Sequence, residues 1–227
     1  GVFLVPYYTI PKIKRELKQI NKIKEVVATL TEKKVVSKKT VRDALQKYRK
    51  TYKTAYIKPL ARAGAEYVLN FVNEEAIMNK IRTVIEVESP IEESCLIDKI
   101  AAAFCVPKTA KKAIAQISRY VSSYEAQRQE YFGKVFYVDK PVSTFRPSDA
   151  RVTRDLTKVH PHEIVAAAKC AIEATVYIEK DDLNKEVFKL FNVAKRTKSA
   201  VEWVDASLTA AVQTGEIIVT PDGFCRI

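Results

Sequence analysis

Residues 91–117, IEESCLIDKIAAAFCVPKTAKKAIAQI, align without a gap with residues 178–204, IEKDDLNKEVFKLFNVAKRTKSAVEWV, at an offset of 87 positions. Eight of the 27 aligned positions are identical, whereas about two are expected from ordinary amino-acid composition. The match keeps an apolar face at four-residue steps, which places Leu96, Ile100 and Phe104 over Leu183, Val187 and Phe191. An internal repeat of this kind predicts two small units of one fold, each with its own core.

Each copy has the pattern of a winged-helix unit: helix, short extended link, helix, tight turn, helix and a pair of strands. The predicted helices cover residues 74–86, 92–104 and 108–123 in the first copy and residues 162–174, 180–191 and 196–213 in the second. Ser89-Pro90-Ile91-Glu92 has the sequence of a capping box that starts a helix. Asn192 suits a left-handed residue in the second tight turn, whereas Cys105, at the same place in the first copy, suits it less well.

Turn signals predict the strand pairs and the domain boundaries. In the second copy, residues 216–220 and 224–227 flank Pro221-Asp222-Gly223, in which Asp-Gly favours a hairpin. In the first copy, residues 134–138 and 142–145 flank Asp139-Lys140-Pro141. The expected fold is mainly α with small β wings, an α+β class. It comprises a basic helical arm (1–60), a first winged-helix-like unit (61–145), a polar linker (146–159) and a second winged-helix-like unit (160–227).

The arm shows two helical patterns. Apolar residues recur every three to four positions between residues 13 and 27. Ser37 is a candidate N-cap for a second helix, predicted to end near Pro59, that carries Val41, Leu45, Tyr48, Tyr52 and Tyr56. Two interpretations of the tyrosines stay open: their rings pack on a neighbouring helix while the interleaved lysines meet a partner, or rings and lysines form one binding surface.

Positive charge is concentrated in the arm. The formal net charge of the chain is +12. Residues 1–60 hold 16 basic and 4 acidic side chains, whereas residues 61–227 hold 23 of each. Such a segment attracts phosphate backbones through counterion release, although an acidic protein or a membrane face would also meet it favourably.

Sequence motifs of catalysis and of cofactor binding are absent. None of the five glycines belongs to a phosphate-binding loop that ends in Lys-Ser or Lys-Thr. No nuclease triad, nucleophile elbow or paired Cys and His is recognisable, and Asp181-Asp182 and Glu92-Glu93 stand at predicted helix starts, where the helix dipole accounts for them. We therefore expect a chain that is not an enzyme and has no cofactor.

Metal and membrane sites are not expected either. The four cysteines are far apart, and His160-Pro161-His162 is read as a helix start with Pro161 first and Glu163 in the first turn. No apolar run approaches the roughly 20 residues of a membrane span, and the first ten residues do not resemble a signal peptide. We expect a cytoplasmic protein, and the apolar start at Gly1 favours a piece of a longer one.

The stretch 84–91, VIEVESPI, together with Leu96, Ile100, Phe104 and a basic third helix, resembles a conserved domain at the C-terminus of large bacterial superfamily-one DNA helicases. The second copy, from Val159, is similar to the region after that domain in the same helicases. The resemblance implies an ATPase motor upstream, often with a nuclease-fold domain related to very-short-patch repair endonucleases, and a role of this region in DNA handling. The chain departs from the family at Cys105, where Gly is usual, and at residues 106–109, where an Arg-rich turn is usual.

Two groups of side chains are candidates for nucleic-acid contact. The arm contributes phosphate contacts through Lys12, Lys14, Arg15, Lys18, Lys22, Lys33, Lys34, Lys38, Lys39 and Arg42. By analogy with helix-turn-helix docking, the third helices contribute Lys108, Lys111, Lys112, Lys195, Arg196 and Lys198. Exposed helices commonly display lysines, and the balanced charge of residues 61–227 supports that simpler reading of the second group.

The leading hypothesis is a non-catalytic, nucleic-acid-binding accessory region of a larger DNA helicase or nuclease-helicase. Its expected partners are duplex or junction DNA and the upstream motor of the same polypeptide, with no membrane and no small-molecule substrate. The alternative is a protein-interaction scaffold in which the units dock a motor or a partner, with Trp203 and Tyr177 at an interface. A buried Trp203 is the more usual outcome, and a sequence-specific transcription regulator is a third possibility.

Overall fold

Two sets of elements with the same order make up most of this computed structural model, which describes residue 18 and residues 38–61, 63–125, 127–150, 152–175 and 177–227. Unit 1 comprises α4 (Glu74–Glu88), β1 (Ile91–Glu92), α5 (Glu93–Ala103), α6 (Lys111–Ser123), β2 (Gln127–Tyr131) and β3 (Lys134–Val138). Unit 2 comprises α7 (Pro161–Thr175), β4 (Ile178–Glu179), α8 (Lys180–Leu190), α9 (Lys198–Gln213), β5 (Ile218–Val219) and β6 (Phe224–Arg226). The predicted fold class, mainly α with small β wings, is confirmed.

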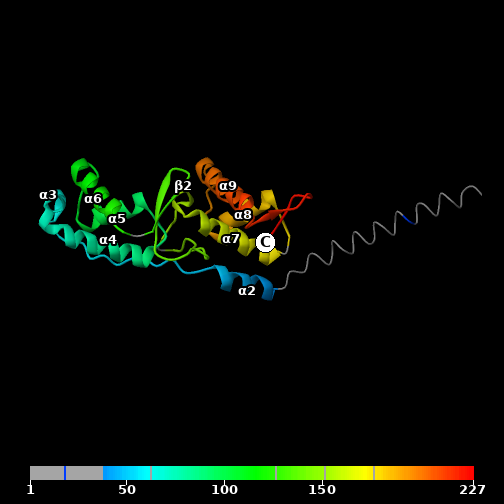
Figure 1. Cartoon of the computed structure of the whole chain (residues 1–227). Coiled ribbons are helices and arrows are strands. Elements are labelled where there is room, and N and C mark those ends of the chain that lie inside the picture. Colours follow the sequence, from blue (N-terminus) through cyan, green and yellow to red (C-terminus); the bar gives the residue numbers. More distant parts are fainter. Residues whose placement is uncertain (1–17, 19–37, 62, 126, 151, 176) are drawn as a thin grey trace, which may run out of the picture.

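Each unit closes with a three-stranded antiparallel sheet, in the order β1-β3-β2 in unit 1 and β4-β6-β5 in unit 2. The extended link expected after the first helix is therefore a strand, which pairs with the last strand of its unit. The two units lie one beyond the other, with β2 between them, and α2 (Lys38–Tyr48) runs beside α7 (Figure 1). The short helices α3 (Gly64–Leu69) and η1 (Phe71–Asn73) precede unit 1, and η2 (Leu156–Lys158) precedes unit 2.

The start of the second helix in unit 1 differs from the predicted capping box. Ser89 is the C-cap of α4, and its hydroxyl accepts a hydrogen bond from the Asp139 amide at 2.6 Å. Glu92 is the N-cap of α5, with a carboxylate oxygen that accepts from the Cys95 amide at 3.2 Å. A carboxylate at this place suits the helix dipole, so one residue both ends β1 and begins α5.

The wing of unit 1 is shifted along the chain from its predicted position. The hairpin joins β2 to β3 through Phe132 and Gly133, both with positive φ (50° and 76°). Two consecutive positive φ values define the tight turn that matches strand twist. The strand predicted at residues 142–145 is wrong, because that segment leads to the buried Phe145, which forms an isolated bridge with Arg49. In unit 2 the wing strands flank residues 221–223, where the sequence predicted them.

The second helix of the arm ends eleven residues before the predicted Pro59, because the backbone beyond Tyr48 finds partners in unit 1 and in the segment after it. The Lys50 amide donates to the Phe145 carbonyl and the Phe145 amide donates to the Tyr48 carbonyl, at 2.9 and 2.8 Å. The Leu60 amide donates to the Ala103 carbonyl at 2.8 Å. The three tyrosines therefore do not share one helical face.

Two apolar clusters form the core, and their membership crosses the unit boundary. One surrounds α4, α5 and α6 of unit 1 and also contains Val68 of α3. The other surrounds α7, α8 and α9 and also contains Phe136, Val138 and Phe145, which follow unit 1 in the chain or belong to its last strand. The third strand of unit 1 thus contributes one face to each core, which holds the two units together.

Cys105 and Asn192 occupy the same left-handed position in the turn before the third helix, with φ of 54° and 56°. The expectation for Asn192 is confirmed. Cys105 adopts the same conformation although a Cβ atom disfavours it, by about 1 to 2 kcal/mol for most side chains.

Cys105→Gly should stabilise the chain by about 1 kcal/mol in urea unfolding, because glycine relieves this strain and the exposed thiol loses little packing. Asn192→Gly is the matched control. It should give no gain, because the Asn192 side chain donates to the Ser148 carbonyl at 2.8 Å and tolerates the left-handed region. A loss of stability in Cys105→Gly would contradict the strain argument.

Candidate nucleic-acid interface

The strongest concentration of positive charge in the described residues is the segment 38–60, which we name the cationic strap. It contains α2 and the extended chain after it, with eight basic residues against one acid, Asp43. All eight basic side chains are exposed: Lys38, Lys39, Arg42, Lys47, Arg49, Lys50, Lys53 and Lys58. The strap passes along unit 2 and then along unit 1, so its charge follows one side of both (Figure 1).

One end of the strap is anchored on α7. Ala44 and Tyr48 are buried against it. The Tyr48 hydroxyl donates to Glu173 Oε1 at 2.8 Å, and Lys47 Nζ lies 2.5 Å from the same oxygen. For Tyr48 the packing interpretation of the tyrosines is confirmed, since the ring faces inward while most of the neighbouring basic side chains face solvent.

The middle of the strap is anchored on unit 1 by Glu88, the buried last residue of α4. Its carboxylate accepts from the Tyr52 hydroxyl at 2.5 Å and from the Ala55 amide at 2.9 Å, and Lys99 Nζ lies 2.9 Å away. Burial, together with the Glu88 carboxylate, raises the pKa of Tyr52, so the phenol stays protonated and keeps this hydrogen bond. Tyr56, four residues further along the chain, is exposed to solvent over 87% of its surface.

Behind the strap lies a charged junction made of Tyr52, Glu88, Arg146, Arg154 and Glu163. Glu163 is completely buried, and Arg146 Nη2 and Arg154 Nη1 approach its carboxylate to 2.6 and 2.8 Å. Both guanidinium groups also stand over the Tyr52 ring, at 5.1 and 4.8 Å from its centroid. The junction therefore joins the strap to the first helix of unit 2.

Arg146 extends the junction into unit 1. Its guanidinium donates to the carbonyls of Glu88, Ser89 and Pro90, at 2.8 to 2.9 Å. Residues 146–159, expected as a linker because of their polarity, do connect the units, but their key polar groups are buried and paired. The polar side chains of this segment therefore form a buried hydrogen-bonded network, whereas their polarity in the sequence predicted a solvated linker.

Glu163 remains ionised in this setting. Burial alone would raise the pKa of its carboxyl, but Arg154 and Arg146 outweigh burial and lower it to about 2. The stabilisation by this charge is therefore complete above its ordinary pKa of 4.5 and is lost as the pH falls toward 2.

His160 and His162 form a helix start, as predicted, with Pro161 as the first residue of α7. His160 Nδ1 accepts from the His162 amide at 3.1 Å, so its Nε2 carries the proton toward Gln129 Oε1, also 3.1 Å away. Burial lowers the pKa of His160 to about 3, and the ring stays neutral. Among the described residues no group of three His, Cys, Asp or Glu side chains converges as a metal site.

The predicted contacts of the third helices lie in the first turns of α6 and α9 or in the turns just before them, and all six are exposed: Lys108, Lys111, Lys112, Lys195, Arg196 and Lys198. Two of them form loose ion pairs, Lys108 Nζ with Asp98 and Lys198 Nζ with Glu202, both at 3.8 Å. Exposed ion pairs at such distances contribute little, so these side chains are free to exchange them for phosphates.

The two third helices differ along their exposed faces. On α6 the exposed positions after the first turn are Ala115, Arg119, Ser122 and Ser123, without an acid. On α9 they include Glu202 and Asp205. Arg119 was not predicted as a contact, although it follows Lys108 and Lys112 at the spacing of one helical face. The face of α6 thus suits a phosphate backbone better than that of α9.

Only some of the predicted arm residues belong to the part of the chain that the structure describes. Lys18, Lys38, Lys39 and Arg42 are exposed, whereas Lys12, Lys14, Arg15, Lys22, Lys33 and Lys34 lie outside the described residues. The strap adds five basic side chains to the predicted set: Lys47, Arg49, Lys50, Lys53 and Lys58. The signal for them was the interleaving of basic residues with Tyr48, Tyr52 and Tyr56.

Trp203, considered for an interface, is buried by the wing of unit 1. Its indole donates to the Val159 carbonyl at 2.9 Å, the Phe132 ring meets it edge-on with centroids 5.4 Å apart, and Lys134 Nζ lies 4.6 Å from its centroid. The turn of this wing therefore packs against Trp203 of unit 2. Tyr177 is half exposed.

Glu163→Gln should lower the free energy of unfolding at pH 7 by about 3 to 5 kcal/mol, because it leaves two buried guanidinium groups without their counter-charge. The difference from the unchanged chain should shrink as the pH falls from 4.5 toward 2, by about 3 kcal/mol, because the native carboxylate is itself protonated there. Denaturant unfolding at several pH values measures this. Glu216→Gln, at a surface pair with Lys169, should cost less than about 1 kcal/mol, and a pH-independent difference for Glu163→Gln would contradict the argument.

Comparisons with known proteins leave the chain without an assigned relative. No family model, no curated protein and no solved structure matches it. None of the described helices combines the length and apolarity needed to cross a bilayer.

Proposed function

We propose that this chain binds the phosphate backbone of nucleic acid, with DNA as its main partner, and that the cationic strap and the face of α6 make the contacts. The observation that carries the proposal is the strap itself: eight exposed basic side chains with a single acid, fixed across both units. A cationic surface held by buried anchors loses less conformational entropy on binding than a free tail.

The dimensions of the strap support a backbone contact. When fully extended, residues 49–60 reach at most about 40 Å, at roughly 3.3 Å per residue. That length corresponds to about a dozen phosphates at 3.4 Å per step along one strand. Side chains spaced along such a path position a nucleic acid without reading its bases, so weak sequence selectivity and a steep salt response are expected.

The larger protein is proposed to be a DNA helicase or nuclease-helicase, on the strength of the resemblance at residues 84–91. In this proposal the chain is an accessory region that does no chemistry of its own and works with an ATPase motor upstream in the same polypeptide. A cytoplasmic location is part of the proposal, and the four unpaired cysteines are consistent with a reducing compartment.

A second candidate function, a protein-interaction scaffold, is favoured by unit 2 in particular. The exposed face of α9 mixes Lys198 with Glu202 and Asp205, and the first turn of α8 carries Asp181 and Asp182. Such a face repels phosphates more than it attracts them. The two functions are compatible if unit 1 and the strap hold nucleic acid while unit 2 meets a protein.

Arg49→Gln, Lys50→Gln and Lys53→Gln combined should weaken binding to fluorescent duplex, forked and single-stranded DNA at least tenfold at low salt. If all three contact phosphates, the slope of log affinity against log salt should also fall by about 2 to 3, because each lost contact removes about 0.9. Fluorescence anisotropy at several salt concentrations measures both.

The matched control removes the same charge from unit 2 through Lys180→Gln, Lys185→Gln and Arg226→Gln, all exposed and outside the strap. Its affinity and salt slope should remain within a factor of about two to three. Equal losses in both variants would mean that only net charge matters, and no binding of the unchanged chain at low salt would leave the scaffold as the function.

Lys112→Gln with Arg119→Gln on α6 should weaken duplex binding more than Lys195→Gln with Lys198→Gln at the start of α9, although both remove two charges. The reason is the acid-free face of α6. The same anisotropy titration compares the pairs, and a larger loss in the α9 pair would overturn the assignment of the contact to unit 1.

A further inference from the structure

Tyr56 is the tyrosine of the cationic strap whose ring faces solvent. Its exposed fraction, 87%, is the largest among the large apolar and aromatic side chains that the described residues expose. Tyr48 and Tyr52 differ from it, because their hydroxyls donate to Glu173 and Glu88 and their rings face inward. Of the two interpretations of the tyrosines, packing therefore applies to these two, and a binding surface of rings and lysines stays open for Tyr56.

The chain on both sides of Tyr56 is fixed on unit 1. The Ala55 amide donates to Glu88 Oε1 at 2.9 Å. The side chains of Ala55 and Ile57 pack on the apolar cluster of unit 1, while the ring between them is exposed. A ring presented by an ordered backbone loses less conformational entropy on binding than one on a free tail.

The ring lies within a stretch of positive charge. Lys53 and Lys58 flank it on the strap, and both are exposed. Lys80 of α4 donates to the Lys58 carbonyl at 3.1 Å, which adds a third cation near the end of the strap. The nearest acids in sequence, Asp43 and Glu66, are thirteen and ten positions away from the tyrosine. Proteins hold single strands with this combination, in which cations meet the phosphates while a base stacks on an aromatic ring.

We propose that the strap holds a single strand of DNA and that one of its bases stacks on Tyr56. The inference rests on the proposed function, because the lysines of the same strap contact the phosphates, and it names the form of DNA that they hold. In a duplex the bases cover each other's faces, and only their edges are open in the grooves. An exposed ring therefore gains a stacking contact from an unpaired base and none from the body of a duplex.

Stacking on a ring is tolerant of sequence, because every base has a flat face. A contact of this kind agrees with the weak sequence selectivity expected of the strap. It adds to the affinity without adding to the salt dependence, which comes from the phosphates alone.

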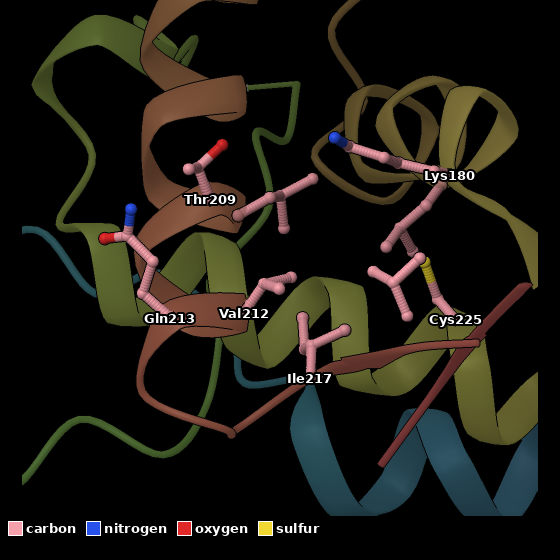
Figure 2. A pocket seen from close by; sticks show the side chains of 9 residues that line it. Lys180, Thr209, Val212, Gln213, Ile217 and Cys225 are labelled. Carbon is pink, nitrogen blue, oxygen red and sulfur yellow. The ribbon is translucent and has the colours of Figure 1, made fainter. Parts of the chain in front are cut away.

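Unit 2 offers no comparable ring at its apolar pocket. This pocket, of about 100 Å³ between α8, α9 and the small sheet, is lined by nine described residues, none of them aromatic (Figure 2). Strand pairing places Cys225 in its wall, opposite Ile178. Tyr137 has the same place in unit 1, opposite Ile91, but is completely buried. Neither unit thus presents an accessible ring to a base at this place, whereas the strap does at Tyr56.

Tyr56→Ala should weaken binding of the whole chain to an oligothymidylate single strand by about 5- to 100-fold at low salt, because it removes one stacked base. The slope of log affinity against log salt should not change, since no phosphate contact is lost. Tyr56→Phe keeps the ring and should bind within a factor of about two of the unchanged chain. Fluorescence anisotropy of labelled strands at several salt concentrations measures all three.

An abasic strand of the same length carries the same phosphates and separates stacking from charge. The unchanged chain should bind it at least about fivefold more weakly than oligothymidylate, and Tyr56→Ala should bind it as the unchanged chain does. Phe71→Ala is the matched control, because it removes another exposed ring, 74% exposed and outside the strap. Its affinity for the single strand should equal that of the unchanged chain. Both rings are largely exposed, so both variants should fold, which their urea midpoints check.

Equal binding of the single strand by Tyr56→Ala and the unchanged chain would disprove the stacking contact. An equal loss on the abasic strand, or on a duplex of the same length, would disprove it as well. The phosphate contact is tested separately: if the combined Arg49→Gln, Lys50→Gln and Lys53→Gln variant loses affinity while Tyr56→Ala does not, the proposed function stands and the stacking contact is wrong. If the unchanged chain binds no DNA at low salt, both are wrong.

Discussion

The buried carboxylate of Glu163 between Arg146 and Arg154 is the interaction on which the arrangement of the chain depends. A single acid at the start of α7 binds two cations from the preceding segment, and one of these cations also binds three carbonyls at the end of α4. The desolvation free energy of burying three charges offsets much of their mutual attraction. Their main consequence is therefore geometric: the placement of the units is the one that satisfies these donors and acceptors together.

That geometry fixes the course of the cationic strap. Tyr52 lies beneath both guanidinium groups while its hydroxyl is bound to Glu88, and Tyr48 is held by Glu173 on α7. Both rings face inward, and most of the basic residues between them face solvent. A segment whose composition suggests a loose tail is thus a fixed surface over its described length. Fixed charges of one sign create a field that a phosphate backbone meets in one orientation.

The sequence predicted the parts of the fold that local patterns determine. Leu96, Ile100 and Phe104, with their counterparts in the second copy, located the second helices, and the turn at residues 221–223 located the second wing. The arm helix beyond Tyr48 was predicted wrongly, because its backbone bonds to Phe145 and Ala103 are distant in sequence and tertiary contacts override helical spacing. The strand prediction at residues 142–145 failed because Phe132-Gly133 is a less common turn pair than Asp-Gly and gives a weaker hairpin signal.

The composition of the candidate interface could be predicted from the sequence, but its shape could not. Lys38, Lys39 and Arg42 were predicted from charge density, whereas Lys58 joins the candidate set only through the path of the strap. Arg146 and Arg154 would have been counted as solvent-facing cations on charge alone, yet both are held inside the junction. Charge in a sequence thus identifies candidate cations, and burial decides which of them face solvent.

The differences between the two units carry more functional information than their likeness. Equivalent positions of the two units carry different side chains. Tyr137 corresponds to Cys225 and Glu93 to Lys180, and the acid-free face of α6 corresponds to a face of α9 that carries Glu202 and Asp205. Unit 1 has a filled core and a cationic outer helix, and its wing is used to bind unit 2 through Trp203. Unit 2 has an open pocket and mixed surface charge. Because the fold is the same in both units, these differences are not needed to form it. They underlie the proposed division, in which unit 1 and the strap hold a polyanion while unit 2 presents a surface to protein.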